Sequence, residues 1–219
     1  YMMLDNVRIP RSYLLGKYGS IDEKGNYTSP IKSWDLRFGI HMSALSSGRA
    51  FLAFTVNIFN ALTIALRYSH SRKQFETTDK KDEIIIIDYP LTQIRLIPEI
   101  SSMVLQLMGG VELAAIYCEK DLFENEAKLT EMHAISAAVK ARYTWSALKA
   151  CEESRTILGG HGYSSLSRIP SIVDDIEVNV TWEGDNNVLL QQTSKYLLRV
   201  IAKKIKTKVL NLDFIYSKI

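Results

Sequence analysis

The stretch TEMHAISAAVKARYTWSALKACEESRTIL, residues 130–158, decides the fold class of this 219-residue chain. It contains neither proline nor glycine, so nothing within it interrupts a helix. The pair Gly159–Gly160 that follows is a strong stop, because glycine takes the left-handed backbone conformation that commonly ends helices. We therefore predict one long helix over about 130–158.

Three further helices are predicted on either side of this one. The first covers about 43–74, where apolar residues recur at helical spacing, namely Leu45, Leu52, Phe59, Leu62 and Leu66. The second covers about 92–123, with Pro98 placed to kink it. The last covers about 186–208, and its basic final turn suits the negative end of the helix dipole. Four long helices joined by loops predict an all-α fold, an antiparallel four-helix bundle.

The segments outside these helices are rich in turn formers or charge. Turn-forming residues interrupt 1–30 at short intervals, so short extended pieces and loops are expected there. A charged loop is predicted from residue 76, running into a short extended stretch that ends before Pro90. These boundaries predict a leader over 1–30, a helical domain over 31–208 and the start of a further region over 209–219.

The composition excludes several classes of protein. Hydrophobic residues make up 47% of the chain and charged residues 23%, which excludes disorder and supplies enough apolar material for a core. The formal net charge is only +3, and basic residues are interleaved with acidic ones. A dedicated nucleic-acid surface is therefore not expected.

Disulfide, metal and membrane-spanning classes are not predicted either. The two cysteines, Cys118 and Cys151, have no zinc-type spacing, and the four histidines are too far apart in sequence to form a local ligand set. The apolar stretch 50–66 is marginal in length for a membrane span and contains Asn57 and Asn60. We predict that it is a buried helix of a soluble protein.

A glycine-rich segment, LGGHGYS at residues 158–164, follows the long predicted helix. Two interpretations are open. Exposed N–H groups in such a segment can hold phosphate oxygens. Taken alone, a helix stop with a wide turn is the simpler interpretation.

An acidic residue stands in the segment TWEGDNN, residues 181–187, just before the last predicted helix. A carboxylate between Trp182 and Gly184 can be partly desolvated and freely placed, which are the properties of a proton-abstracting base. Asp185 or Asn186 is better explained as the N-cap of the helix. Glu183 lies outside that cap, so capping leaves it unexplained.

Two arginines are candidates for ligand binding. Arg72 lies at the end of the first predicted helix, where cations are ordinary, yet its guanidinium could also fork onto a pyrophosphate. Arg49 lies inside an otherwise apolar stretch. A guanidinium in such a place must be paired or must reach a ligand.

Several segments occur in order along nearly the whole chain: 4–11, 37–39 with 45–49, 67–69 with 72–75, 88–91, 132–134 with 140–141, 159–163 and 181–192. Taken together, they resemble the acyl-CoA oxidase family. The run 183–194 is most similar to the branched-chain (pristanoyl-CoA type) subgroup.

The resemblance implies the C-terminal helical fold of that family, FAD as the cofactor and a fatty acyl-CoA as the substrate. In the family a glutamate removes the α-proton of the thioester while a hydride leaves the β-carbon for flavin N5. The product is a trans-2-enoyl-CoA, and oxygen reoxidises the flavin to give hydrogen peroxide. The family's base falls on Glu183. The implied compartment is the peroxisome, and residues 217–219, SKI, resemble a peroxisomal address.

The resemblance also implies a homodimer that grips FAD across its interface. The residues that fall on cofactor-binding positions are Arg72, Gln74, Phe75, Gly159, Gly160, Asp185 and Asn187. Arg49 falls on an arginine that contacts acyl-CoA in the related dehydrogenases, although Ser46 stands where those have an acidic residue.

The resemblance covers only part of the family's architecture. Residues 1–30 match only the tail of the β-domain that covers the flavin, so we expect this chain alone to bind FAD weakly or not at all. Two other functions stay open. One is a truncated, non-catalytic dimerisation partner, and the other is an acyl-CoA dehydrogenase that uses an electron-transfer protein instead of oxygen.

Overall fold

The structure is a computed structural model that describes residues 1–16, 19–30, 45–46, 48–49, 56–77, 80–119, 122 and 125–206. The chain forms two compact units, Tyr1–Ala44 and Leu45–Ile219. Some predicted features lie outside the described residues: the segment 37–39, most of the first half of the first helix, the region 209–219 and its SKI tripeptide.

The first unit contains a small hairpin. A 3-10 turn at Arg11–Tyr13 precedes the strands β1 (Ser20–Ile21) and β2 (Tyr27–Thr28), which pair antiparallel. The Asp22 carboxylate fixes the turn between them, since its Oδ1 accepts hydrogen bonds from the backbone N–H groups of Lys24 (2.9 Å) and Asn26 (2.8 Å). Extended pieces and loops are what the turn formers predict for this segment.

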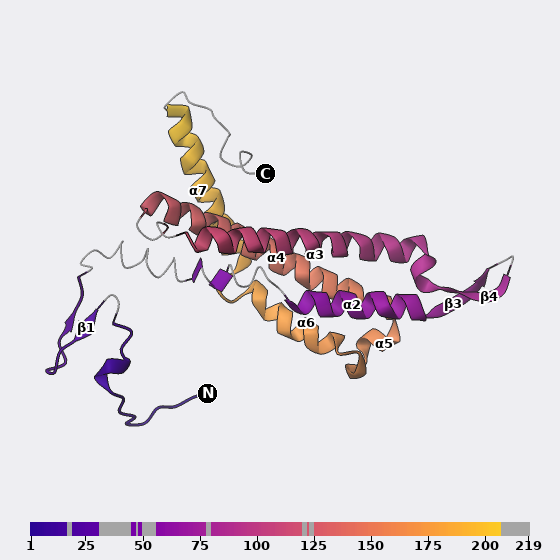
Figure 1. The fold of residues 1–219 in the computed structure, drawn as a ribbon, viewed down its shortest axis with the longest axis horizontal. Coiled ribbons are helices and arrows are strands. Elements are labelled where there is room, and N and C mark those ends of the chain that lie inside the picture. The colour runs from indigo at the N-terminus through magenta and orange to yellow at the C-terminus, as the bar shows by residue number, and fades with distance from the viewer. Residues whose placement is uncertain are drawn as a thin grey trace. The chain divides into compact units, whose positions relative to one another are not determined.

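The second unit is helical, which confirms the all-α fold class (Figure 1). Its helices are α2 (Val56–Ser71), α3 (Pro90–Tyr117), α4 (Glu126–Ile157), α5 (Gly160–Tyr163), α6 (Ile169–Glu177) and α7 (Asn186–Lys206), with 3-10 turns at Ile86–Asp88, Ser165–Ser167 and Val178–Val180. The predicted helices correspond to α2, α3, α4 and α7. Helix α6 is not among the predicted helices, although its apolar residues recur at helical spacing, namely Ile169, Ile172, Val173 and Ile176.

The long helix α4 is the centre of this unit. It contacts α2, α3, α6 and α7. Small residues make these close approaches possible, because alanines at four positions of α4 are completely buried: Ala137, Ala141, Ala147 and Ala150. The main apolar core joins α4 to α2 and α6 through residues such as Cys151, Leu62 and Ile176. The segment that decides the fold class from sequence is thus also the helix around which the others pack.

The connection between α2 and α3 is a hairpin rather than the predicted charged loop. Strands β3 (Lys73–Thr77) and β4 (Lys80–Ile85) pair antiparallel. The ladder is irregular next to Phe75, whose φ of 65° is left-handed. Backbone pairing between strands does not require apolar residues, and this explains why a charged stretch can form a hairpin.

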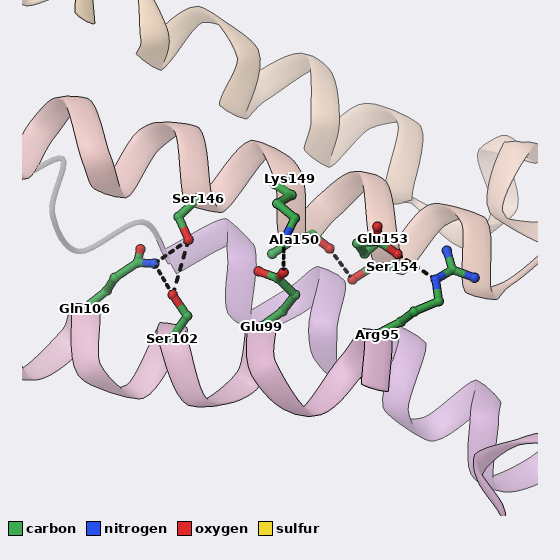
Figure 2. A network of polar contacts seen from close by, with 9 residues as sticks. All are labelled: Arg95, Glu99, Ser102, Gln106, Ser146, Lys149, Ala150, Glu153 and Ser154. Atoms are coloured by element: carbon green, nitrogen blue, oxygen red, sulfur yellow. Dashed lines mark hydrogen bonds and ion pairs between the residues drawn. The ribbon is translucent and has the colours of Figure 1, made fainter. Parts of the chain in front are cut away.

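Polar side chains join α3 to α4 along their contact (Figure 2). The Lys149 ammonium pairs with the Glu99 carboxylate at 2.7 Å, and the Gln106 amide donates to the Ser146 hydroxyl at 2.8 Å. Helix α3 continues without a break through Gly109 and Gly110. A Cβ at Gly109 would overlap the Tyr143 hydroxyl, so this glycine permits the close approach of the two helices.

The other face of α3 is apolar and exposed. Its exposed apolar residues include Leu91, Ile94, Ile97, Val104, Leu105, Met108 and Val111. By length and composition α3 is the one helix among the described residues that could cross a membrane, and 17% of its most apolar window is buried. The absence of a membrane span therefore stays a prediction.

Candidate active site

The turn between the Val178–Val180 segment and α7 carries the predicted base. Helix α7 begins at Asn186 because Asp185 caps it: Asp185 Oδ1 accepts from the backbone N–H groups of Asn187 (3.0 Å) and Val188 (3.2 Å). The capping interpretation of Asp185 is confirmed. Glu183 lies two residues before the cap and takes no part in it.

One oxygen of the Glu183 carboxyl group is buried and has no hydrogen-bond partner in the part of the chain that the structure describes. This oxygen is Oε2, and the residue as a whole is half-buried. Gly48 makes room for this group, since a Cβ there would lie 2.9 Å from both Cδ and Oε2 of Glu183. A buried carboxylate oxygen without a partner carries a desolvation cost, and it has the free lone pairs that a base needs.

Arg49 anchors the backbone of Glu183 from the segment that precedes α2. Its side chain is 2% exposed, and its Nε donates to the carbonyl oxygen of Glu183 at 2.9 Å. Burial lowers the pKa of the guanidinium, while the nearby Glu183 carboxylate raises it. Arg49 is thus paired within the chain, as a buried guanidinium must be. Its predicted contact with acyl-CoA stays a prediction.

The same arginine reaches a histidine on α4. Arg49 Nη1 lies 3.1 Å from His133 Nδ1, and His133 Nε2 lies 3.0 Å from Gln192 Oε1 on α7. A guanidinium has no acceptor, so Nδ1 accepts and Nε2 carries the proton that is donated to Gln192. Burial, and then the charge of Arg49, lower the pKa of His133, while the bond to Gln192 raises it. The hydrogen bonds to Arg49 and Gln192 together require the neutral imidazole ring of His133.

Acidification is expected to weaken the fold through His133. Because the folded pKa lies below the ordinary value of about 6.5, the unfolded chain binds this proton first. The stability that the ring contributes is complete above about pH 6.5 and is lost below it, by at most about 1.4 kcal/mol per pH unit. Urea unfolding between about pH 5 and 8 measures this slope. His133→Asn should reduce the slope, and equal slopes in the two proteins would contradict the assignment.

A lysine that the sequence analysis gave no role completes the surroundings of Glu183. Lys140 on α4 is completely buried, and its Nζ donates to the carbonyl oxygen of Gly184 at 2.7 Å and to Asn186 Oδ1 at 2.8 Å. Burial, and next the charge of Arg49, lower its pKa to about 8, against the opposing effect of Asp185 and Glu183. A signal was present in the sequence: Lys140 follows Ala137 by three positions on the buried stripe of a helix, where a lysine needs partners.

The residues predicted to hold the FAD pyrophosphate gather at the C-terminal end of α4. Arg72 follows α2 directly, Gln74 and Phe75 lie on β3, and Gly159 and Gly160 follow α4. The rings of Tyr68 and His161 join these two segments, with their centroids 5.8 Å apart. Arg72, Phe75 and both glycines are exposed, and a Cβ at either glycine would meet nothing within 4 Å.

One chain does not bring these two sets of residues together. Lys140, which contacts the Glu183 turn, and Leu158, which precedes the glycines, are 18 positions apart along α4 and its C-cap. At the rise of an α-helix this is about 27 Å. The base and the pyrophosphate-binding candidates are therefore two separate surfaces. Among the described residues, no group of three or more His, Cys, Asp or Glu side chains is placed to hold a metal ion.

The sequence is similar to known proteins over most of its length. Residues 43–198 match the family model described as acyl-CoA oxidase, C-alpha1 domain. Human peroxisomal acyl-coenzyme A oxidase 3 is 38% identical over 215 residues, which cover 94% of this chain and 31% of that protein. Peroxisomal acyl-coenzyme A oxidase 3 of Arabidopsis thaliana is 38% identical over 196 residues, which cover 88% of this chain and 28% of that protein. The chain spans about a third of the length of these curated relatives.

Solved structures show the same fold. Acyl-CoA oxidase-2 of Caenorhabditis elegans, bound with FAD, ascaroside-CoA and ATP, matches with a TM-score of 0.79 at 29% identity, over 94% of this chain and 31% of that one. Acyl-CoA oxidase 1 of Arabidopsis thaliana matches with a TM-score of 0.76 at 31% identity. The match covers 92% of this chain and 31% of that one.

Proposed function

Because the chain belongs to the acyl-CoA oxidase family, we propose that it is the helical part of an FAD-dependent oxidase of fatty acyl-CoA thioesters. The proposed reaction is α,β-dehydrogenation to a trans-2-enoyl-CoA, with oxygen reduced to hydrogen peroxide. The curated relatives are named as peroxisomal. We propose the same compartment for this protein, with a role in fatty acid β-oxidation.

The observation that carries the proposal is the buried Glu183 Oε2, which has no hydrogen-bond partner in the part of the chain that the structure describes. Abstraction of the α-proton needs a carboxylate whose lone pairs are not already used, and Oε2 meets this condition among the described residues. Arg49 holds the backbone of Glu183, so the carboxylate is presented from a fixed point. Gly48 keeps the space beside the carboxylate free of a side chain.

FAD fits the other surface of the chain. When bound, it would accept the hydride from the β-carbon and pass the electrons to oxygen. The exposed Arg72 offers a fork of donors for a pyrophosphate, and the uncovered backbone at Gly159 and Gly160 permits close approach. Gln74 and Phe75 lie on this surface. The other cofactor-binding candidates, Asp185 and Asn187, lie beside Glu183 at the start of α7, and we propose that they contact the cofactor from that side.

The separation of the two surfaces supports a homodimer. Within a single chain, Lys140, which holds the Glu183 turn, and Leu158, which precedes Gly159, lie about 27 Å apart along α4 and its C-cap. We propose that Arg72, Gly159 and Gly160 of one copy bind the cofactor that serves Glu183 of the other. A site shared in this way would join the Glu183 turn, beside the middle of α4 in one copy, to the C-terminal end of α4 in the other.

A chimera tests the proposed function. Residues 43–198 of this chain would replace the matching domain of the Caenorhabditis elegans acyl-CoA oxidase-2, which supplies the remaining domains. Acyl-CoA oxidation is measured by oxygen consumption and peroxide formation, with straight-chain and 2-methyl acyl-CoA substrates. Turnover with one peroxide per enoyl-CoA supports the oxidase. Turnover that needs an artificial electron acceptor and consumes no oxygen would favour a dehydrogenase.

A third result of the same experiment would point to a non-catalytic partner. A chimera that folds, dimerises and keeps its flavin, yet oxidises neither substrate with oxygen or an artificial acceptor, would contradict both enzymatic proposals. Replacing Arg72 with methionine gives a separate test of the cofactor surface, because the loss of flavin should follow the loss of the guanidinium.

A further inference from the structure

We propose that Lys140 is a positioning residue for the base: its buried ammonium group fixes the carbonyl oxygen of Gly184 and thereby the turn that carries Glu183. The inference rests on the proposed function for the role of Glu183. The structural part, that Lys140 holds this turn, is testable without any activity.

The turn is held at two consecutive carbonyl groups by two buried cations. Arg49 Nε donates to the carbonyl oxygen of Glu183 at 2.9 Å, and Lys140 Nζ donates to that of Gly184 at 2.7 Å. The two cations come from segments far apart in the sequence. Two anchors on neighbouring peptide groups restrict rotation about the bonds between them, and a single anchor leaves that rotation free.

The turn needs such anchors because its backbone is unfavourable. Glu183 has a φ of 55° and Gly184 a φ of 109°. A side chain at a positive φ is disfavoured by sterics, so the surrounding structure must hold Glu183 in place. Hydrogen bonds to both carbonyl oxygens oppose the relaxation of Glu183 to an extended conformation, which would turn its side chain away from Gly48.

Lys140 also connects the turn to the start of α7. Its second bond goes to Asn186 Oδ1, and the Asn186 amide donates to Thr144 Oγ1 at 3.0 Å and to the carbonyl oxygen of Ala141 at 3.3 Å. Asn186 is 1% exposed. Glu183 is thereby fixed to α4, the helix that all the other long helices contact.

Amide hydrogen exchange on the purified chain tests the structural part. Lys140→Met removes the ammonium group and keeps an unbranched apolar side chain. Exchange over residues 182–187 is expected to rise by at least about tenfold, the effect of losing one of the two hydrogen bonds that the ammonium group donates, while exchange in α2 stays unchanged. The matched control is Lys195→Met, the same change at an exposed lysine on α7. Unchanged exchange over 182–187 in Lys140→Met would overturn the inference.

Activity in the chimera tests the positioning role. Lys140→Met is expected to lower kcat per bound flavin by about 10- to 100-fold, with KM for acyl-CoA changed by less than about threefold. A merely structural role would lower the yield of folded protein and leave kcat per flavin unchanged, and that result would overturn the positioning role. If the unsubstituted chimera is inactive, the proposed function fails, and hydrogen exchange still decides whether Lys140 holds the turn.

A second variant covers the case in which Lys140→Met does not fold. Lys140→Gln replaces the ammonium group with an uncharged amide donor on a side chain that is one atom shorter. Because of this shorter reach, the amide cannot donate to both Gly184 O and Asn186 Oδ1. We expect the same rise in exchange over 182–187. Protection equal to that of the unsubstituted chain would overturn the inference.

Discussion

Glu183→Gln is expected to lower kcat in the chimera by about 10²- to 10⁴-fold, the contribution typical of a positioned general base. Glutamine has nearly the shape of glutamate but cannot accept the α-proton. The backbone anchors at Glu183 and Gly184 are carbonyl groups and are unchanged by the substitution. Binding of acyl-CoA and FAD should therefore persist, and the loss should appear in the rate of flavin reduction, measured by stopped-flow absorbance.

The control is Glu177→Gln, the same change at an exposed carboxylate that ends α6. It should leave flavin reduction within about twofold of the unsubstituted chimera, since ordinary surface changes have small effects. If Glu183→Gln reduced the flavin at the unsubstituted rate, Glu183 would not be the base. If it lost flavin or substrate binding instead, its role would lie in binding rather than in proton transfer.

Gly162→Ala is expected to destabilise the purified chain by about 3 kcal/mol, the upper part of the range for overpacking. Gly162 is buried, and a Cβ there would overlap the carbonyl oxygen of Arg155 and lie 2.8 Å from its carbonyl carbon. Backbone atoms in the last turn of α4 cannot swing aside as a flexible side chain would. The melting temperature should fall by roughly 6 to 12 °C.

Gly160→Ala is the matched control, two residues earlier in the same short helix. A Cβ at Gly160 would meet nothing within 4 Å, so this substitution should keep the stability within about 0.5 kcal/mol. Equal melting temperatures for the two variants would contradict the close approach of α5 to α4. Comparing these two variants also distinguishes the roles of the two glycines. Gly162 is required for packing, and Gly160 is a candidate for cofactor contact.

Much of the fold follows from the sequence because helices are specified locally. The stop at Gly159–Gly160 and the start of α7 at Asn186 were both predicted from adjacent residues, and both are confirmed. The N-terminus of α4 differs, since Asn125 caps it by accepting from Ala127 and Lys128. The helix therefore begins at Glu126, four residues before the predicted start at about residue 130.

Other elements depend on contacts that no local pattern reveals. The hairpin of β3 and β4 consists largely of charged and polar residues, and backbone pairing, not side-chain pattern, creates it. Helix α6 spans only Ile169–Glu177, and its residues Ile169 and Ile176 are buried because α4 and α2 lie against it. Isolated helices of this length are marginal in water, and tertiary packing decides whether they form.

The sequence by itself determined the helical fold and the family, and it predicted Glu183 as the base, because each depends on neighbouring residues or on ordered motifs. Only the tertiary structure decided what surrounds the Glu183 carboxylate. Arg49 and Glu183 are 134 positions apart, Lys140 and Gly184 are 44 apart, and neither hydrogen bond has a local signature. The structure also placed the Glu183 turn beside the middle of α4, through Lys140, and Gly159 just after the C-terminal end of that helix. The physical reason is that hydrogen bonding and capping act within a few residues of the chain, while the burial of a cation beside a strained turn requires the whole core to assemble first.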